Sequence, residues 1–236
     1  PNYDVAYENG TGDMNAYTVT VEKADYDMRG VTFENASPEY DGTEKTITIS
    51  GALPTGEDGI QVTVSYSGTN GTALTNAGST EITATFATTS TNYNVPEAKT
   101  ATLTITPVTL TIKDISGNYT DYTAADIVID DMVSGILEGD TEGVTITPAW
   151  NTPLADEDGW LAANTYNATL SLGGDKAVNY TFGSDNVATV TVSPFDLSGA
   201  QVTITSAPFT YNGNEQTVLY TVLTGEGGKD ITSVLT

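Results

Sequence analysis

The stretch Thr100–Thr106 reads T-A-T-L-T-I-T. The phase of this pattern, meaning which alternate positions are apolar, indicates how the chain is divided into sheets. Small and aliphatic side chains alternate with Thr, which predicts a strand with one buried face and one solvent-exposed face. After Pro107 the phase reverses, because the apolar residues of Val108–Ile112 (V-T-L-T-I) fall on the other set of positions. One continuous strand cannot bury both sets on one face, and Pro interrupts a strand ladder. We therefore expect Pro107 to separate two sheets or two domains.

Internal repeats surround this boundary. Three segments run from an Asn-Tyr pair into a Thr-rich alternating strand, and these strands are 18–22 (T-V-T-V-E), 102–106 (T-L-T-I-T) and 189–193 (T-V-T-V-S). Two segments also begin alike, because residues 24–46 align without gaps on residues 195–217. Self-similarity of this kind indicates tandem repeats.

These repeats predict an all-β chain of tandem immunoglobulin-like β-sandwich domains. Residues 1–23 would be the closing strands of a preceding domain, and residues 194–236 the front half of a further one. Residues 24–106 and 107–193 would each form a complete sandwich, because they have the size and the regularly spaced short strands of that class. The joints have essentially no linker, so we expect stiff end-to-end stacking.

Composition excludes several classes of function. The net charge is -24, from 31 acidic and 7 basic side chains, which argues against nucleic acid and anionic membranes as partners. No apolar run reaches the roughly 18 residues of a membrane span, so we expect no membrane insertion in this segment. The absence of Cys and His removes disulfides, Cys nucleophiles, His-based triads and most zinc sites. We expect no enzyme and no cofactor, with calcium left open.

The motif Tyr40-Asp41-Gly42-Thr43 carries a resemblance. With the later strand Gly59–Val64 and the closing Asn-Tyr segment, it resembles the YDG-type repeats of bacterial cell-surface adhesins. Tyr211-Asn212-Gly213-Asn214 keeps the turn and departs from the motif at two positions. An Asp-Gly or Asn-Gly pair suits a tight turn, because Gly adopts positive φ without penalty. We expect Tyr40 and Tyr211 to be aromatic anchors at strand ends.

The middle repeat is similar to the MBG-type repeats that alternate with YDG-type repeats. The similarity rests on Ser134–Thr141 (S-G-I-L-E-G-D-T), Asn164-Thr165-Tyr166 and Asn179-Tyr180-Thr181. Together the two resemblances imply an extracellular protein of the cell surface in which repeats form a stalk that projects a binding tip. They imply no catalytic residues. Partners would be neighbouring repeats or identical subunits, and a host or matrix glycan or protein at the tip.

A few residues are candidates for binding. Asp156 and Asp158, in Asp156-Glu157-Asp158-Gly159, offer carboxylates beside a Gly turn, a fragment of a calcium loop without the full EF-hand pattern. Trp160 follows this turn and is the candidate ligand platform, whereas the parity of Trp150 points it inward. The other acidic groups of this repeat, Glu138, Asp140 and Glu142 among them, are interpreted as solvated loop charge.

Two further functions stay open beside the stalk. The unpaired halves at 1–23 and 194–236 would expose sheet edges, so one molecule's tail could complete the next in a self-assembling extracellular filament. A carbohydrate-binding module would rest on Trp160. The tripeptides that begin at Asn118, Asn167 and Asn179 match the N-glycosylation sequon, which we interpret as coincidence.

Overall fold

The structure, a computed structural model, describes residues 21–118, 121–157, 159–194, 197–206, 208–223, 230 and 232. Strands predominate in this part of the chain, and its helical segments are short turns. The β-rich class expected from the sequence is therefore confirmed. Within the same residues, no helix is long and apolar enough to cross a membrane.

The described residues form two compact units. Unit 1 draws on the described residues within 21–36, 46–73 and 80–103, and unit 2 on those within 37–45, 74–79 and 104–232. In chain order the elements are β1 (Lys45–Thr46), β2 (Thr63–Gly68), β3 (Ala73–Leu74), β4 (Gly78–Ala87), β5 (Lys99–Ile105), β6 (Val108–Thr109), β7 (Thr111–Ile112), β8 (Ile115–Asn118), η1 (Ala124–Asp126), α1 (Ile129–Met132), β9 (Val133–Ser134), η2 (Glu138–Gly143), β10 (Thr145–Trp150), β11 (Asp156–Glu157), β12 (Trp160–Leu161), β13 (Asn164–Gly173), η3 (Ala177–Asn179), β14 (Tyr180–Thr181), β15 (Val187–Ser193), η4 (Leu197–Gly199), β16 (Gln201–Ile204) and β17 (Tyr220–Leu223).

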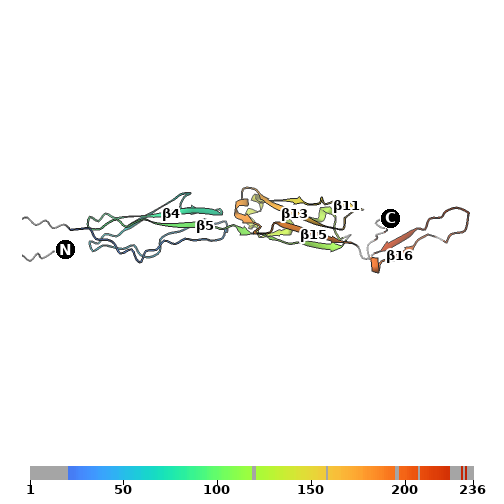
Figure 1. Cartoon of the computed structure of the whole chain (residues 1–236), viewed down its shortest axis with the longest axis horizontal. Coiled ribbons are helices and arrows are strands. Elements are labelled where there is room, and N and C mark those ends of the chain that lie inside the picture. Colours follow the sequence, from blue (N-terminus) through green and yellow to red (C-terminus); the bar gives the residue numbers. More distant parts are fainter. Residues whose placement is uncertain are drawn as a thin grey trace, which may run out of the picture. The chain divides into compact units, whose positions relative to one another are not determined.

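Unit 1 holds most of a three-stranded sheet in the order β2-β4-β5, with β4 in the centre (Figure 1). β2 and β4 are antiparallel, and Val64 lies opposite Phe86. Residues 80–86 (T-E-I-T-A-T-F) alternate in the same way, and β4 buries Ile82, Ala84 and Phe86 of this pattern. Phe86 and Ala84 belong to the core of this unit, which further includes Tyr26, Val31 and Val62.

Unit 2 is built on a four-stranded sheet in the order β10-β13-β15-β8. β13 pairs antiparallel with both β10 and β15, whereas β15 and β8 are parallel. Figure 1 labels β13 and β15 side by side in this sheet. Their alternating apolar side chains, such as Leu170 and Val190, form a core with Leu161 and with Met132 of α1. The opposite faces of these strands carry mainly Thr, Ser and Asn, as expected for solvated strand faces.

Pro107 lies between two sheets. β5 ends at Ile105 and belongs to the sheet with β4, whereas β6 begins at Val108 and pairs in parallel with β14. Ala101, Leu103 and Ile105 of β5 are buried. Beyond the proline Leu110 is buried, whereas Val108 and Ile112 are partly buried. The reversal of phase in the sequence thus corresponds to a change of sheet.

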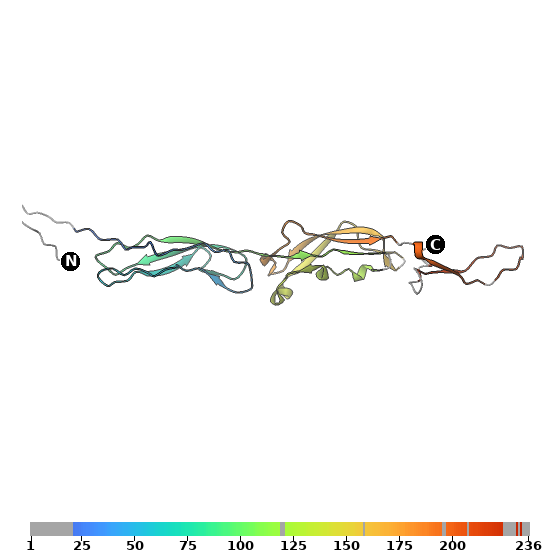
Figure 2. The ribbon, with the colours of Figure 1, turned by 90° about the horizontal axis from the view of Figure 1, so that it is seen from below.

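The aligned segments 24–46 and 195–217 share local geometry. Thr32 pairs antiparallel with Ser50. The same residue offset, continued four positions beyond the aligned range, carries this pair onto Thr203 and Thr221, which pair antiparallel between β16 and β17. Figure 2 shows β16 in the hairpin that it forms with β17. The turn glycines also match, because φ is 79° at Gly42 and 78° at the equivalent Gly213. The internal repeat is therefore one of structure as well as of sequence.

Candidate functional site

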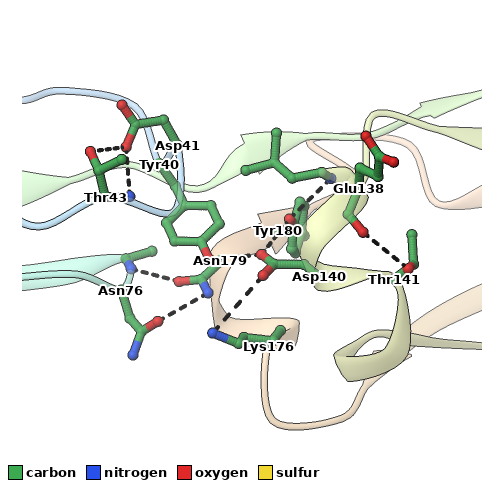
Figure 3. Close-up of polar contacts among 12 residues, drawn as sticks. Tyr40, Asp41, Thr43, Asn76, Glu138, Asp140, Thr141, Lys176, Asn179 and Tyr180 are labelled. Carbon is green, nitrogen blue, oxygen red and sulfur yellow. Dashed lines mark hydrogen bonds and ion pairs between the residues drawn. The ribbon is translucent and has the colours of Figure 1, made fainter.

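Tyr40 reaches the interior of unit 2 from the turn of its own motif. The Asp41 carboxylate accepts hydrogen bonds from the Thr43 amide at 2.9 Å and from the Thr43 hydroxyl at 2.7 Å (Figure 3). Lys45 adds an ion pair to Asp41 at 2.6 Å. Since Gly42 takes the positive φ that this tight turn requires, the chain reverses directly after Tyr40. The contacts of Asp41 and the conformation of Gly42 therefore hold the turn that follows Tyr40.

Asp140 of η2 is the centre of a buried network, which we define as Tyr40, Asp140, Tyr180 and Lys176 and call the junction network. One carboxylate oxygen, Oδ2, accepts hydrogen bonds from the Tyr40 and Tyr180 hydroxyls, each at 2.7 Å. Asp140 is only 7% exposed, so water does not compete for these bonds. The two rings meet edge to face, with centroids 5.8 Å apart and planes at 80°. The two phenol hydroxyls thus donate the hydrogen bonds that water would donate to an exposed carboxylate.

Two weaker contacts complete the junction network. The Lys176 ammonium lies 3.9 Å from the second carboxylate oxygen of Asp140, Oδ1, and its side chain is partly exposed. The Leu137 amide donates to the Tyr180 hydroxyl at 3.2 Å, so that hydroxyl both donates and accepts. Figure 3 shows the Lys176 side chain approaching the carboxylate from the side opposite the rings. The negative charge is therefore partly neutralised by Lys176, and one of its two oxygens, Oδ2, accepts two hydrogen bonds.

The pKa values follow from this geometry. Burial acts to raise the pKa of Asp140, but the hydrogen bonds from Tyr40 and Tyr180 and the charge of Lys176 outweigh it and hold that pKa below its ordinary value. Burial and the bond to Asp140 raise the pKa of Tyr40 to about 12. Burial and the same carboxylate raise the pKa of Tyr180 to about 12. At neutral pH the network therefore consists of one carboxylate and two protonated phenols, which act as fixed donors.

An apolar cluster encloses the junction network. Tyr40 and Tyr180 pack with Ile105, Leu110 and Val144, all of which are buried. Ile105 ends β5, Leu110 follows β6, and Val144 follows η2. Three further segments of the chain therefore converge on the two tyrosine rings. Each ring buries a large apolar area, which makes these contacts a strong contribution to the stability of unit 2.

Asn179 provides a second clamp beside the first. Its side chain is fully buried, its carbonyl oxygen accepts from the Ala77 amide at 2.7 Å, and its amide donates to the Asn76 carbonyl oxygen at 3.2 Å. Figure 3 places Asn76 and Asn179 facing one another next to Lys176. Because the Asn179 amide is buried and hydrogen-bonded, the sequon that begins there offers no accessible acceptor, which agrees with our interpretation of it as coincidence.

The sequence motifs meet at this site. Tyr40 belongs to the Y-D-G-T motif, Asp140 to the G-D-T string and Tyr180 to the N-Y-T string. The interpretation of Asp140 as solvated loop charge was wrong, because the two phenols and the apolar cluster bury it. Glu138 and Glu142, in the same short helix, are exposed as expected. The sequence held one indication of this network, because Tyr40, Asp140 and Tyr180 each belong to one of the motifs.

Tyr211 differs from its counterpart. Both tyrosines were expected to be anchors; Tyr40 is 3% exposed, whereas Tyr211 is 92% exposed. The turn after it is the same, since Asn212 accepts the Asn214 amide at 3.0 Å. The physical reason lies in the surroundings, because no described residue occupies around Tyr211 the places that Ile105, Asp140 and Tyr180 occupy around Tyr40.

The predicted calcium residues are only partly described. Asp156 lies on β11, is exposed, and accepts a hydrogen bond from the Ala124 amide at 2.6 Å. Asp158 lies outside the described residues. Among the residues that the structure does describe, no three acidic side chains gather closely enough to hold a metal ion. The calcium site remains a prediction that rests on the sequence.

The two tryptophans are both half-buried. Trp160 lies on β12, opposite Glu157 of β11. Trp150 ends β10 and packs against the core of unit 2, consistent with its expected inward direction. A ring that is half covered presents less surface to a flat ligand than a fully exposed one, and a ligand role for Trp160 stays a prediction.

The chain was compared with known proteins. No family model matches it, and the search of curated proteins gives no match. The resemblance to YDG-type and MBG-type repeats therefore rests on the motifs within this sequence.

Proposed function

We propose that this chain is a structural segment of a bacterial cell-surface adhesin, a stalk of tandem immunoglobulin-like sandwiches that carries a binding tip away from the cell. The observation that carries the proposal is the junction network. It brings the Y-D-G-T turn of the first repeat against the G-D-T and N-Y-T strings of the second, inside one compact unit. Residues that define the motifs thus form contacts between distant segments of the chain.

The proposed role is mechanical. A stalk transmits force and direction only when consecutive repeats cannot swivel at their joint. Tyr40 and Tyr180 supply directional hydrogen bonds to a buried charge, and such bonds are shorter and stronger than neutral ones. Asn179 adds a second point of attachment to Asn76 and Ala77. Two separate points of attachment resist rotation, which one alone would permit.

The acidic surface fits the same role. With a net charge of -24, neighbouring stalks repel one another and stay soluble. The exposed faces of β10, β13 and β15 carry Thr, Ser and Asn, which hydrate without adding charge. The surface therefore serves solvation, and binding belongs to a tip outside this segment.

Small-angle X-ray scattering of the full chain tests the shape that this proposal requires. A compact domain of 236 residues would have a radius of gyration of about 18 Å. A stalk segment should give a clearly larger value that does not change with protein concentration. A radius near that of a compact domain would contradict the proposal.

Display on a bacterial surface tests the role itself. The chain would be placed between a surface anchor and a small peptide tag, and capture of a bulky tag-binding protein would be measured. A flexible Gly/Ser linker of equal length is the matched control, because it coils back toward the cell. We expect higher capture with the chain than with the linker. Equal capture would count against a stiff spacer.

A further inference from the structure

Unit 1 contains a cleft that the proposed function leaves unexplained. One wall is formed by Asp25, Tyr26 and Met28, and the other by residues 94–99. All of these residues belong to unit 1. The volume of the cleft is about 490 Å³, which lies within the roughly 300–1,000 Å³ that small-molecule sites occupy. The cleft is therefore large enough for a compact ligand.

The course of the backbone explains why the two walls separate. Ala24 pairs in parallel with Tyr93, where the two segments begin to run together. The first segment then takes a different partner, because Thr32 pairs antiparallel with Ser50. It returns at Ala36, which pairs in parallel with the closing strand β5. The cleft therefore lies beside the stretch in which the first segment has left the closing segment.

The edge beside the cleft is protected against a further strand. β5 is the last strand of its sheet, and Lys99 places a charge at its first position. Pro96, just before it, has no amide hydrogen to donate. Proline and lysine on an edge are devices that prevent strand addition. The cleft therefore suits a compact ligand better than an extended peptide.

Asp25 and Asn94 form a fixed polar pair in the cleft. The Asn94 side-chain amide donates to Oδ1 of Asp25 at 2.8 Å, and the Asn94 backbone amide donates to the Ala24 carbonyl at 2.8 Å. The strand pairing itself does not require these side chains, because in unit 2 a Thr follows each member of the equivalent parallel pair, Val108 and Tyr180. A polar pair that is already held in place loses little conformational freedom when it binds a ligand.

The apolar part of the lining is rigid as well. The Tyr26 ring stacks on Tyr93, with centroids 4.5 Å apart and planes at 29°. The Tyr26 hydroxyl donates to the Ile60 carbonyl at 3.2 Å and is hydrogen-bonded to the Thr88 hydroxyl at 2.8 Å. Val95, on the opposite wall, is 60% exposed and adds apolar surface. The cleft therefore offers an apolar side that does not have to form on binding.

Charged groups of both signs line the cleft. Lys99 supplies an ammonium group, and Asp25 and Glu97 supply carboxylates. This mixture favours neither sign of ligand, and the net charge of -24 repels anions. The same groups are hydrogen-bond donors and acceptors for hydroxyls. A neutral sugar carries hydroxyls around its ring and apolar C–H groups on its faces, so it matches both the polar and the apolar lining.

We propose that this cleft binds a short neutral saccharide. Its hydroxyls bond to Asp25, Asn94 and Lys99, and one apolar face of the sugar packs against Tyr26 and Val95. In such a site the polar groups set orientation and specificity, and the apolar lining adds contact area. The proposed stalk requires no ligand along its length, so this inference goes beyond it. A stalk with such a site holds a glycan at its side in addition to what its tip binds.

NMR titration of the isotope-labelled full chain is the test. The probes are cellobiose, maltose and N,N′-diacetylchitobiose, with glycine as a zwitterionic comparison. We expect at least one of these disaccharides to cause saturable shifts. The shifts should centre on the amides of residues 25–28 and 94–99, which form the two walls. Glycine should cause none.

Asp25→Ala and Lys99→Met should each weaken binding by about tenfold or more, because each removes a charged partner of the sugar hydroxyls. Asp27→Ala is the control for the first, because Asp27 is exposed in the same segment and does not line the cleft. Lys113→Met is the control for the second, because Lys113 is exposed and lies in unit 2. Both controls should bind as the wild-type chain does. Asp25 is exposed and Met preserves most of the apolar stem of Lys99, so both test variants should fold.

Three results would overturn the proposal. The first is that no disaccharide causes saturable shifts; if glycine does so instead, the cleft belongs to a zwitterion. The second is that the shifts centre on residues outside 25–28 and 94–99. The third is that a control variant weakens binding as much as the test variant with which it is paired. None of these results bears on the scattering test of the stalk.

Discussion

Asp140 carries a negative charge in a buried position, and hydrogen bonds from two phenols stabilise that charge. Both hydroxyls converge on one carboxylate oxygen at 2.7 Å. Removing the acceptor would leave two buried donors without a partner, and each such donor costs about 1–3 kcal/mol. The stability of unit 2 therefore depends strongly on this one side chain.

Asp140→Ala should lower the free energy of unfolding by about 3 kcal/mol, because two buried phenols lose their acceptor together. Glu142→Ala is the matched control, since it removes the same charge from an exposed position in the same short helix. It should change stability by less than about 0.5 kcal/mol. Urea denaturation of both variants measures the difference. Equal effects would show that burial of Asp140 contributes nothing.

Alkaline pH should weaken the fold through Tyr40 and Tyr180. Their folded pKa of about 12 lies above the ordinary value of 10.0, so the folded state holds these protons more tightly than the unfolded state. Their contribution to stability is complete below pH 10 and is lost as the pH rises toward 12.

Tyr40→Phe tests this dependence. It should cost about 2 kcal/mol at neutral pH, because a hydrogen bond to a charged acceptor is lost. It should also flatten the decline of stability between pH 10 and 12, because one of the two shifted phenols is gone. Urea midpoints measured across this range provide the readout. An identical alkaline slope in wild type and variant would contradict the assignment.

Acid acts on the same network in the opposite sense. The pKa of Asp140 is depressed in the folded state, so its contribution is present above the ordinary carboxyl pKa of about 3.9 and is lost as the pH falls through the lower folded value. The junction network is therefore most stable across the broad neutral range between these two limits.

Among the local elements, the Y-D-G-T turn that follows Tyr40 depends on the conformation of Gly42. Gly42 has a φ of 79°, a region in which a Cβ atom is strained. Gly42→Ala should therefore cost about 1 kcal/mol or more. Gly42→Asn should cost less, because Asn tolerates this conformation. Thermal unfolding of both variants separates backbone strain from a simple loss of glycine. Equal costs for Ala and Asn would argue against strain.

Strand phases were predictable because they are local. The alternation in T-E-I-T-A-T-F and T-A-T-L-T-I-T anticipates the buried faces of β4 and β5, since side chains of a strand point to opposite sides in turn. The reversal at Pro107 anticipates the change of sheet between β5 and β6. The turn glycines Gly42 and Gly213 were also predictable, because only local backbone geometry is involved.

The junction network was not predictable, because it is built from distant residues. Tyr40 and Asp140 are 100 positions apart, and Asp140 and Tyr180 are 40 apart. An acidic residue in a Gly-rich loop is ordinarily solvated, and nothing local to Asp140 distinguishes it from Glu138 or Glu142. Only tertiary packing brings two phenols to it. For the same reason the matching motifs of Tyr40 and Tyr211 do not predict that Tyr40 is buried and Tyr211 exposed.

In the molecule as a whole, composition and the proposed mechanical role are consistent with one another. The buried polar side chains of Asp140 and Asn179 hold distant segments together, and the net charge of -24 makes copies of the chain repel one another. Both properties suit a protein that must stay extended, and together they support the proposed stalk.

The central claim is that the junction network fixes the end of the first repeat against the second, and a spin-label distance tests it most directly. The chain contains no Cys, so Glu44→Cys and Thr147→Cys, both exposed positions of unit 2, can be labelled without background. Thr147→Cys with Ser193→Cys, within the sheet of β10 and β15, serves as the control pair.

We predict one narrow distance distribution for the pair at 44 and 147. In the Asp140→Ala background it should broaden, while the control pair stays narrow. A broad distribution for residues 44 and 147 in the otherwise wild-type chain, or one that Asp140→Ala leaves unchanged, would contradict the account.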